Sequence, residues 1–145
     1  VAESKQTIRF SHQPGGFKAV HATSSGKALL SVLSPEERQK WFKAYGGFTA
    51  FTDRTITTRA AFDSDLQAGV ERGWQRSVGE NVEDVMSMSL GFRAYEQPFA
   101  IVVAGPLGRM LKNEATTGKQ LEEVKALMHA ALPSANLTFV GEDSR

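Results

Sequence analysis

The feature that most constrains the fold is a run of strand-like segments, residues 74–78, 85–92 and 99–104, with no helical pattern between them. Apolar and β-branched residues are frequent in them, as in strands that are at least half buried. The second and third segments are separated by Arg93-Ala94-Tyr95-Glu96-Gln97-Pro98. This connection is short enough for a hairpin, so the pattern predicts an antiparallel sheet.

Helical patterns precede the strands. A small-residue run, His21-Ala22-Thr23-Ser24-Ser25-Gly26-Lys27-Ala28, leads into apolar positions up to residue 33, which predicts a helix whose first turn is small and hydroxylated. Ser34 then predicts a new helix as its N-cap, with Pro35 at the first helical position and Glu37 closing a capping box. We expect this second helix to end at Gly46-Gly47. Its apolar side consists of Trp41, Phe42 and Tyr45.

Three further segments complete the prediction. Phe62, Leu66 and Val70 are spaced four apart on one face of a third helix that should close at Arg72-Gly73, and a last amphipathic helix is predicted over residues 121–132. Residues 7–11 alternate like a strand, whereas residues 48–57 suggest an irregular connection. Together these elements predict one α+β domain, in which helices pack on an antiparallel sheet.

Composition excludes several classes of function. The 145 residues include no cysteine, so disulfides, thiolate zinc sites and a cysteine nucleophile are excluded. Seventeen basic against 16 acidic residues give a net charge of +1, too little for a surface that grips nucleic acid by its phosphates. Nothing resembles a membrane span or a signal peptide, so a cytoplasmic location is expected. A start without methionine or a helix cap suggests a fragment of a longer polypeptide.

Apparent catalytic and metal motifs are weak. Ser24 and Lys27 match the serine-x-x-lysine pattern of acyl-serine enzymes, but its companion elements are absent, and Gly26-Lys27 lacks the remainder of a phosphate-binding loop. No catalytic residue and no cofactor are therefore expected. His12, His21 and His129 have no metal-ligand spacing, which favours surface or capping roles and predicts no metal site. The acidic group Glu80, Glu83 and Asp84 should face water in a turn.

The hydroxyl cluster at Thr23, Ser24 and Ser25 supports two interpretations. In the first turn of a helix several N–H groups lack intrahelical partners, and the helix dipole favours an anion there. The cluster could therefore bind an anionic ligand. Simple N-capping explains the same residues without any ligand.

Motifs along the chain resemble the effector-binding domain of IclR-type bacterial transcriptional regulators. The similar segments are residues 21–30, Arg72-Gly73-Trp74, Glu80-Asn81-Val82 and Ala104-Gly105-Pro106. The resemblance implies a GAF-like fold, a curved antiparallel sheet with helices on its faces that holds a small metabolite, often a carboxylate, in a pocket above the sheet. It further implies a winged helix-turn-helix domain before residue 1, which would make the contacts to DNA, and assembly into homodimers or tetramers.

The resemblance also implies the ligand-binding positions. The family's pocket would hold a carboxylate with the backbone and side chains of Ser24 and Ser25, and Ser87 matches another polar contact. Relatives can have an acid at Ser77 and serines at Val102 and Ala104, so this pocket should be less polar, which disfavours the smallest oxo acids. Less secure wall positions are Phe10, Phe17, Lys18 and Val85.

Asp84 stands where the family commonly has glycine.

From the resemblance we expect a sensor that binds a carboxylic acid, of an aromatic or medium-sized kind, without transforming it. Two alternatives remain open from the sequence: a serine-dependent hydrolase or acyl-transfer enzyme on the same scaffold, and an oligomerisation module with a vestigial pocket. In the enzyme, Lys27 would be the base, because its helical spacing permits contact with Ser24.

Overall fold

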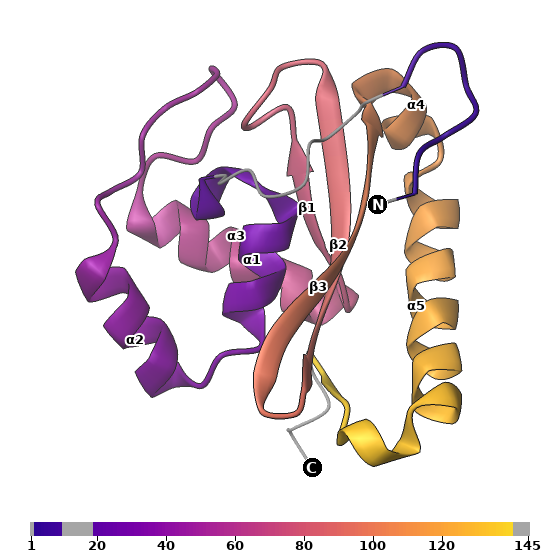
Figure 1. The fold of residues 1–145 in the computed structure, drawn as a ribbon. Coiled ribbons are helices and arrows are strands. Elements are labelled where there is room, and N and C mark those ends of the chain that lie inside the picture. Colours follow the sequence, from indigo (N-terminus) through magenta and orange to yellow (C-terminus); the bar gives the residue numbers. More distant parts are fainter. Residues whose placement is uncertain (1, 10–18, 141–145) are drawn as a thin grey trace.

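A computed structural model describes residues 2–9 and 19–140 of the chain. Helices come first, then a three-strand meander, then further helices and a short last strand (Figure 1). The helices are η1 (Val20–Ala22), α1 (Ser24–Ser31), α2 (Pro35–Ala44), α3 (Arg59–Arg72), α4 (Leu107–Lys112), α5 (Glu114–Ala131) and η2 (Pro133–Ala135). The strands are β1 (Gln75–Val78), β2 (Val85–Ala94), β3 (Gln97–Pro106) and β4 (Thr138–Phe139).

The strands form one antiparallel sheet in the order β1-β2-β3, and β4 pairs with the far end of β2. The turn between β2 and β3 consists of Tyr95 and Glu96, with φ angles of 50° and 62°. Two successive left-handed residues match the right-handed twist of the strands that they join. The predicted α+β class, the antiparallel sheet and its hairpin are therefore confirmed.

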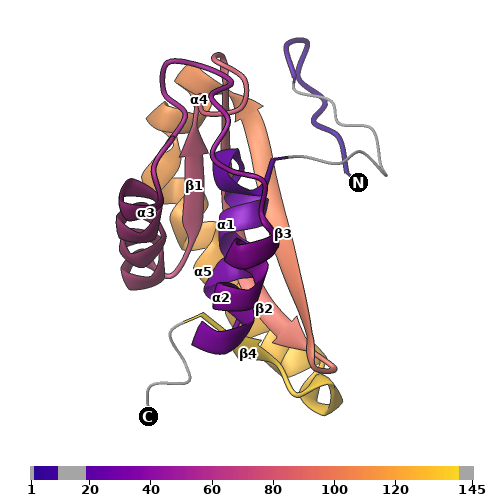
Figure 2. The ribbon, with the colours of Figure 1, turned by 90° about the vertical axis from the view of Figure 1, so that its left-hand side faces the viewer.

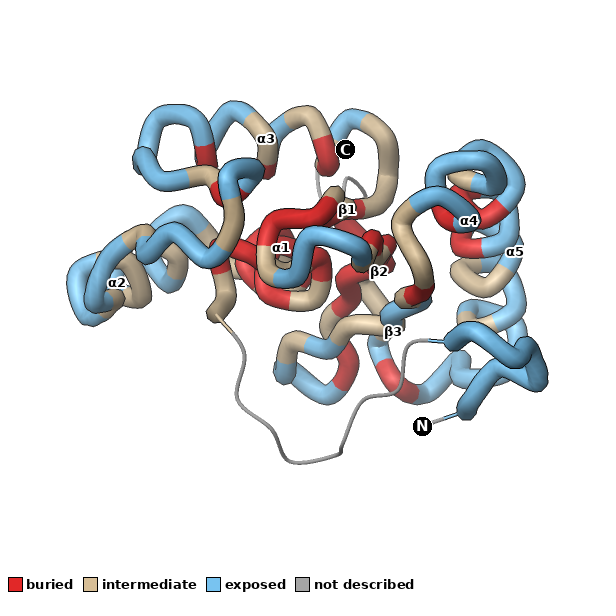
Figure 3. Tube along the Cα trace, turned by 90° about the horizontal axis from the view of Figure 1, so that it is seen from above, coloured by how far each residue is buried: buried red, intermediate tan, exposed pale blue. Residues whose placement is uncertain are grey.

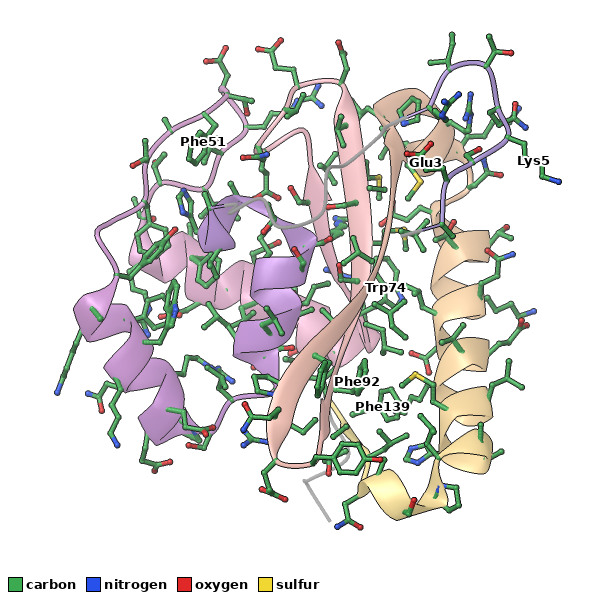
Figure 4. The ribbon with its side chains drawn as sticks, viewed as in Figure 1. Glu3, Lys5, Phe51, Trp74, Phe92 and Phe139 are labelled. Carbon is green, nitrogen blue, oxygen red and sulfur yellow. The ribbon has the colours of Figure 1, made fainter. Side chains whose placement is uncertain are left out.

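The two faces of β2 differ completely in chemistry. Met86, Met88, Leu90 and Phe92 face the largest core, which α5 covers. Figure 4 shows Phe92 beside Phe139 in this layer, and their ring centroids are 5.6 Å apart. The residues between them face the other way, toward α1. Because side chains alternate along a strand, one face is apolar throughout and the other is free to carry small and polar groups.

Helix α1 lies directly on this second face (Figure 2). At Gly91 an added Cβ would lie only 2.3 Å from the carbonyl oxygen of Ala28, so the absence of a side chain lets the helix backbone approach the strand. Buried residues accordingly concentrate in α1 and the middle of the sheet when the molecule is seen from above (Figure 3). The close approach positions the first turn of α1 over the sheet.

A second core joins α1, α2 and α3. Leu30, Phe62 and Leu66 are buried there, with Trp41 and Phe42 of α2 packed against them. This arrangement agrees with the apolar faces expected for both helices. The start of α2 and the end of α3 also agree with expectation, whereas α2 ends at Ala44, before the expected stop at Gly46-Gly47.

The predicted helix signals act as expected. The Ser34 hydroxyl accepts a hydrogen bond from the Glu37 N–H at 3.2 Å, and the Glu37 carboxylate accepts one from the Ser34 N–H at 2.8 Å. α3 ends at Gly73, whose φ of 87° is left-handed. The capping box and the glycine stop were both predicted from local sequence.

Histidine 21 was expected at the surface or in a cap, and that expectation is wrong. It is 1% exposed, and its Nδ1 lies 2.5 Å from the Tyr45 hydroxyl while its Nε2 lies 2.8 Å from the Thr49 carbonyl oxygen. The Nε2–H donates to the Thr49 carbonyl oxygen, and Nδ1 shares its hydrogen bond with the Tyr45 hydroxyl, so both ring nitrogens have partners. His129 is exposed, as expected, and His12 lies outside the described residues.

The expected strand over residues 7–11 is also wrong where it is described. Residues 7–9 form no strand, and Ile8 is 69% exposed, so the apolar residue of the alternating pattern is not buried against a core. The last helix begins seven positions earlier than expected, at Glu114, where Thr117 and Gly118 give little apolar signal. Gly118 is needed there, since a Cβ would lie 2.9 Å from the indole nitrogen of Trp74. Helix α4 and strand β4 were not predicted.

Candidate ligand-binding site

A cavity of about 490 Å³ lies between the first turn of α1 and the polar face of the sheet. One wall comes from η1 and α1, the floor from the sheet, and part of the rim from the loop after β1 and from the N-terminal segment. The lining residues are Ala2, Glu3, Ala22, Thr23, Ser25, Ser77, Asn81, Val82, Val85, Ser87, Ala100, Val102 and Ala104.

Strand register brings the floor residues together. Ser77 of β1 is opposite Ser87 of β2, which is opposite Ala104 of β3, so the three form one row across the sheet. Val102 is opposite Ser89 in the next row on the same face. Hydroxyls therefore lie toward β1 and apolar groups toward β3. The floor has a polar side and an apolar side.

The first turn of α1 is capped from within. Thr23 Oγ1 accepts a hydrogen bond from the Gly26 N–H at 3.2 Å and donates one to the Ala19 carbonyl oxygen at 3.1 Å. The N-capping interpretation of the cluster is therefore confirmed for Thr23. Capping by Thr23 does not occupy the whole first turn. Ser25 is half-buried and lines the cavity, so its side chain can still contact a ligand.

Ser24 lies one layer deeper than the cavity wall. It is fully buried, and its Oγ donates to Ser87 Oγ at 2.7 Å and lies 2.6 Å from Ser89 Oγ. Ser89 is also fully buried. The Ser24 side chain is thus packed between α1 and the floor of the cavity, whereas the sequence suggested that it would face the ligand.

The acidic turn after β1 departs from expectation. Glu83 and Asp84 are exposed, as expected, but Glu80 is only 7% exposed. Both of its carboxylate oxygens lie 2.8 Å from Lys27 Nζ, which explains how the charge is tolerated. Burial raises the pKa of the Glu80 carboxyl, and the nearby Lys27 ammonium opposes that rise. The expectation that Glu80 faces water is wrong.

Lys27 is likewise committed to this cluster. Its ammonium is fully buried, 2.7 Å from Asp65 Oδ2 and 3.1 Å from the Arg76 carbonyl oxygen. Glu80 and Asp65 surround it, and none of its described hydrogen bonds goes to Ser24. The one base that the sequence offered for a serine nucleophile is therefore held elsewhere, between two carboxylates.

Two absences hold for residues 2–9 and 19–140. No group of three histidine, aspartate or glutamate side chains is arranged to hold a metal ion. No helix in that part of the chain has the length and apolar character required to cross a bilayer.

A family model described as "Bacterial transcriptional regulator IclR C-terminal" matches residues 2–131. The chain belongs to this IclR family. It is similar to the HTH-type transcriptional regulator BhcR of Paracoccus denitrificans, with 32% identity over 111 residues, which are 75% of this chain and 39% of BhcR. The chain spans less than half the length of the curated relatives that it matches, 39% to 48%.

Solved structures of the IclR family share the fold. The crystal structure of the Thermotoga maritima IclR matches with a TM-score of 0.75 at 20% identity, over 86% of this chain and 51% of that one. The inducer-binding domain of the PobR transcription factor from Acinetobacter, a double mutant in complex with 3-hydroxybenzoic acid, matches with a TM-score of 0.56 at 25% identity. That match covers 72% of this chain and 64% of the PobR chain.

The positions that the IclR resemblance suggested have different places in the structure. Those that line the cavity are Ser25, Ser77, Ser87, Val85, Val102 and Ala104. Ser24 does not line it, because its side chain is buried between α1 and β2, while Phe10, Phe17 and Lys18 are outside the described residues. Their roles in binding stay predictions.

The lining residues that sequence reasoning missed are Ala2, Glu3, Ala22, Asn81, Val82 and Ala100. Strand alternation could have found Ala100, which precedes Val102 by two positions on the same face.

Proposed function

We propose that this domain is the ligand sensor of an IclR-type regulator and binds a small carboxylic acid without transforming it. The observation that carries the proposal is the cavity itself, about 490 Å³ between a small, hydroxylated helix turn and a sheet floor with one apolar side. That volume is typical of small-molecule sites, in which a few placed polar groups orient a largely apolar ligand.

The carboxylate would lie at the first turn of α1. The Gly26 and Lys27 N–H groups are already bonded to Thr23, and Ser24 is fully buried, but the N–H of Ser25, which lines the cavity, precedes the first intrahelical bond. The helix dipole favours a negative charge there. Glu3 is the one charged residue among the described lining residues. Its Oε2 lies 3.4 Å from Arg9 Nε, and the positive charge of Arg9 offsets the repulsion between Glu3 and an anionic ligand.

The body of the ligand would lie on the β3 side of the floor. Val85, Ala100, Val102 and Ala104 offer only apolar contacts there. Burying a ring or alkyl chain against them contributes about 25 cal/mol per Å², whereas a polar group left unpaired would cost about 1–3 kcal/mol. An aromatic or medium-sized acid should therefore bind more tightly than glyoxylate or pyruvate. The 3-hydroxybenzoic acid in the PobR complex supports this class.

An enzyme is the less favoured alternative. Lys27 would have to leave two carboxylates to serve as a base for Ser24, and Ser24 is itself buried between α1 and β2. We therefore propose that no covalent step occurs. A ligand would act by favouring one arrangement of the longer, homo-oligomeric protein, with a coupling of about 1–3 kcal/mol to DNA binding by a preceding domain.

Calorimetry with benzoate, 3-hydroxybenzoate, glyoxylate and pyruvate tests the proposal. The expected result is binding of the aromatic acids, tighter than that of the two small acids, with every compound recovered unchanged by mass spectrometry. Conversion of a bound compound would favour the enzyme. Absence of binding by all four acids would favour the oligomerisation module.

A further inference from the structure

Two neighbouring serines of the cavity floor have opposite hydrogen-bonding polarity. Ser77 and Ser87 are register partners on β1 and β2, and both line the cavity. Each hydroxyl has one hydrogen and two lone pairs. Whether the hydrogen or a lone pair is free to face the cavity depends on which of them already takes part in a hydrogen bond within the protein.

Ser87 is left as a donor. Its oxygen accepts the hydrogen of Ser24 at 2.7 Å. Since Ser24 has given its only hydrogen to Ser87, the 2.6 Å contact between Ser24 and Ser89 must be donated by Ser89. Ser24 and Ser89 are both 0% exposed, which leaves no solvent beside them to reorient the hydroxyls. The buried chain from Ser89 through Ser24 thus leaves the hydrogen of Ser87 free for the cavity.

Ser77 is left as an acceptor. Its hydroxyl donates to the Ala22 carbonyl oxygen at 2.8 Å, and the side chain is 4% exposed. With its hydrogen engaged, only lone pairs remain for a ligand. The floor therefore offers a donor and an acceptor side by side.

We propose that this pair recognises a hydroxyl group of the ligand, so that the effector is a hydroxy acid, with Ser24 and Ser89 as positioning residues. A hydroxyl is the small group that donates to Ser77 and accepts from Ser87 through one atom. A carboxylate, ketone or ether only accepts and leaves Ser77 unused. The inference rests on the proposed function, in which the carboxylate occupies the first turn of α1.

The same geometry restricts where the hydroxyl lies. On the β1 side it meets Ser77 and Ser87, but on the β3 side it would meet Val102 and Ala104 and lose its hydrogen bonds to water without replacement. Among isomers of one acid, affinity should depend strongly on the ring position of the hydroxyl.

Calorimetry with benzoate and its 2-, 3- and 4-hydroxy isomers tests this. We expect at least one isomer to bind about tenfold more tightly than benzoate, and the methyl ether of that isomer, which cannot donate, to lose the advantage. All three isomers within twofold of benzoate, with benzoate still bound, would overturn the inference and leave the proposed function standing. No binding by any of these acids would overturn both.

Serine-to-alanine variants locate the effect. Ser77→Ala should reduce the ratio of the hydroxybenzoate affinity to the benzoate affinity to near one. Ser89→Ala changes a residue that touches no ligand but should reduce the same ratio. Without the hydrogen bond from Ser89, the Ser24 hydroxyl is no longer fixed as a donor to Ser87, and Ser87 is no longer fixed as a donor to the cavity. Ser31→Ala is the matched control, since Ser31 donates within α1 to the Ala28 carbonyl oxygen and does not line the cavity. A ratio that survives in both Ser77→Ala and Ser89→Ala would overturn the inference.

Discussion

Lys27 Nζ lies 2.8 Å from both carboxylate oxygens of Glu80 in an interior where the lysine has no exposed surface. The contact joins α1 to the loop after β1, which supplies Asn81 and Val82 to the cavity rim. Asp65 of α3 adds a second carboxylate at 2.7 Å. One ammonium group thus ties two elements of the ligand site, α1 and the loop after β1, to α3.

Replacing Lys27 by methionine should therefore destabilise the domain strongly. The buried Glu80 carboxylate and the partly exposed Asp65 carboxylate would lose their counter-charge, and breaking a buried pair from one side costs about 3–5 kcal/mol. Urea unfolding followed by circular dichroism measures the change. Asp63→Asn is the control, because its pair with Arg59 is exposed and should cost about 0.3–0.5 kcal/mol. Equal losses in the two variants would show that the cluster contributes no more than a surface pair.

The pH dependence of stability should carry a signature of Glu80. Burial raises the pKa of its carboxyl above 4.5 in the folded state, although Lys27 opposes the rise. The folded state then binds the proton more readily than the unfolded state, so this group's contribution to stability falls as pH rises from about 4.5 through the folded pKa. Glu80→Gln should remove that slope in unfolding measurements across the range.

Glu37 offers a control of opposite sign. Hydrogen bonds from the Ser34 backbone and from Arg93 lower the pKa of its carboxyl below 4.5. Its contribution is therefore present above 4.5 and lost as pH falls through the folded pKa. Glu37→Gln should flatten the acid limb of the stability profile. The same slope change in both variants would contradict the assignment for Glu80.

Replacing Ser25 by leucine should abolish ligand binding and leave the fold intact. The half-buried side chain faces the cavity, so added volume would fill the anion site, and the core would be unaffected. Titration with an aromatic acid should show at least a tenfold loss of affinity, while circular dichroism stays unchanged. Ser25→Ala keeps the space open and should retain binding. A folded leucine variant with undiminished affinity would remove Ser25 from the site.

Gly91→Ala should damage both stability and the cavity. The new methyl group would meet the Ala28 carbonyl oxygen at 2.3 Å, and α1 must move away from β2 to admit it. Overpacking of this kind costs about 1–3 kcal/mol, measurable as a lower urea midpoint. At Gly108 of α4 a Cβ meets nothing within 4 Å, so Gly108→Ala should stabilise by up to about 1 kcal/mol. Similar behaviour of the two variants would mean that α1 does not depend on close approach.

The fold was predictable where its signals are local. Ser34 and Glu37 are three residues apart, Phe62 and Leu66 are one helical turn apart, and the hairpin closes over a two-residue turn. Glu80 was misplaced because its partner is 53 positions away, and His21 because Tyr45 is 24 positions away. Nothing next to either residue in the sequence indicates burial.

The sequence predicted the region of the site better than the directions in which its side chains point. The serine run located one wall, but two consecutive hydroxyls point in directions about 100° apart on a helix, and the sequence alone does not choose between them. Packing against Ser87 and Ser89 turns Ser24 inward and leaves Ser25 at the cavity.

The alternation of side chains along β2 places the residues that stabilise the fold on one face and the residues that recognise the ligand on the other. Met86, Met88 and Leu90 pack under α5, while Ser87 and Ser89 belong to the ligand side of the same strand. Substitutions at Val85 and Ser87, which line the cavity, alter what is recognised without removing a methionine from the core. A lineage of such domains can therefore exchange one ligand for another in small steps, each made on a scaffold that already folds.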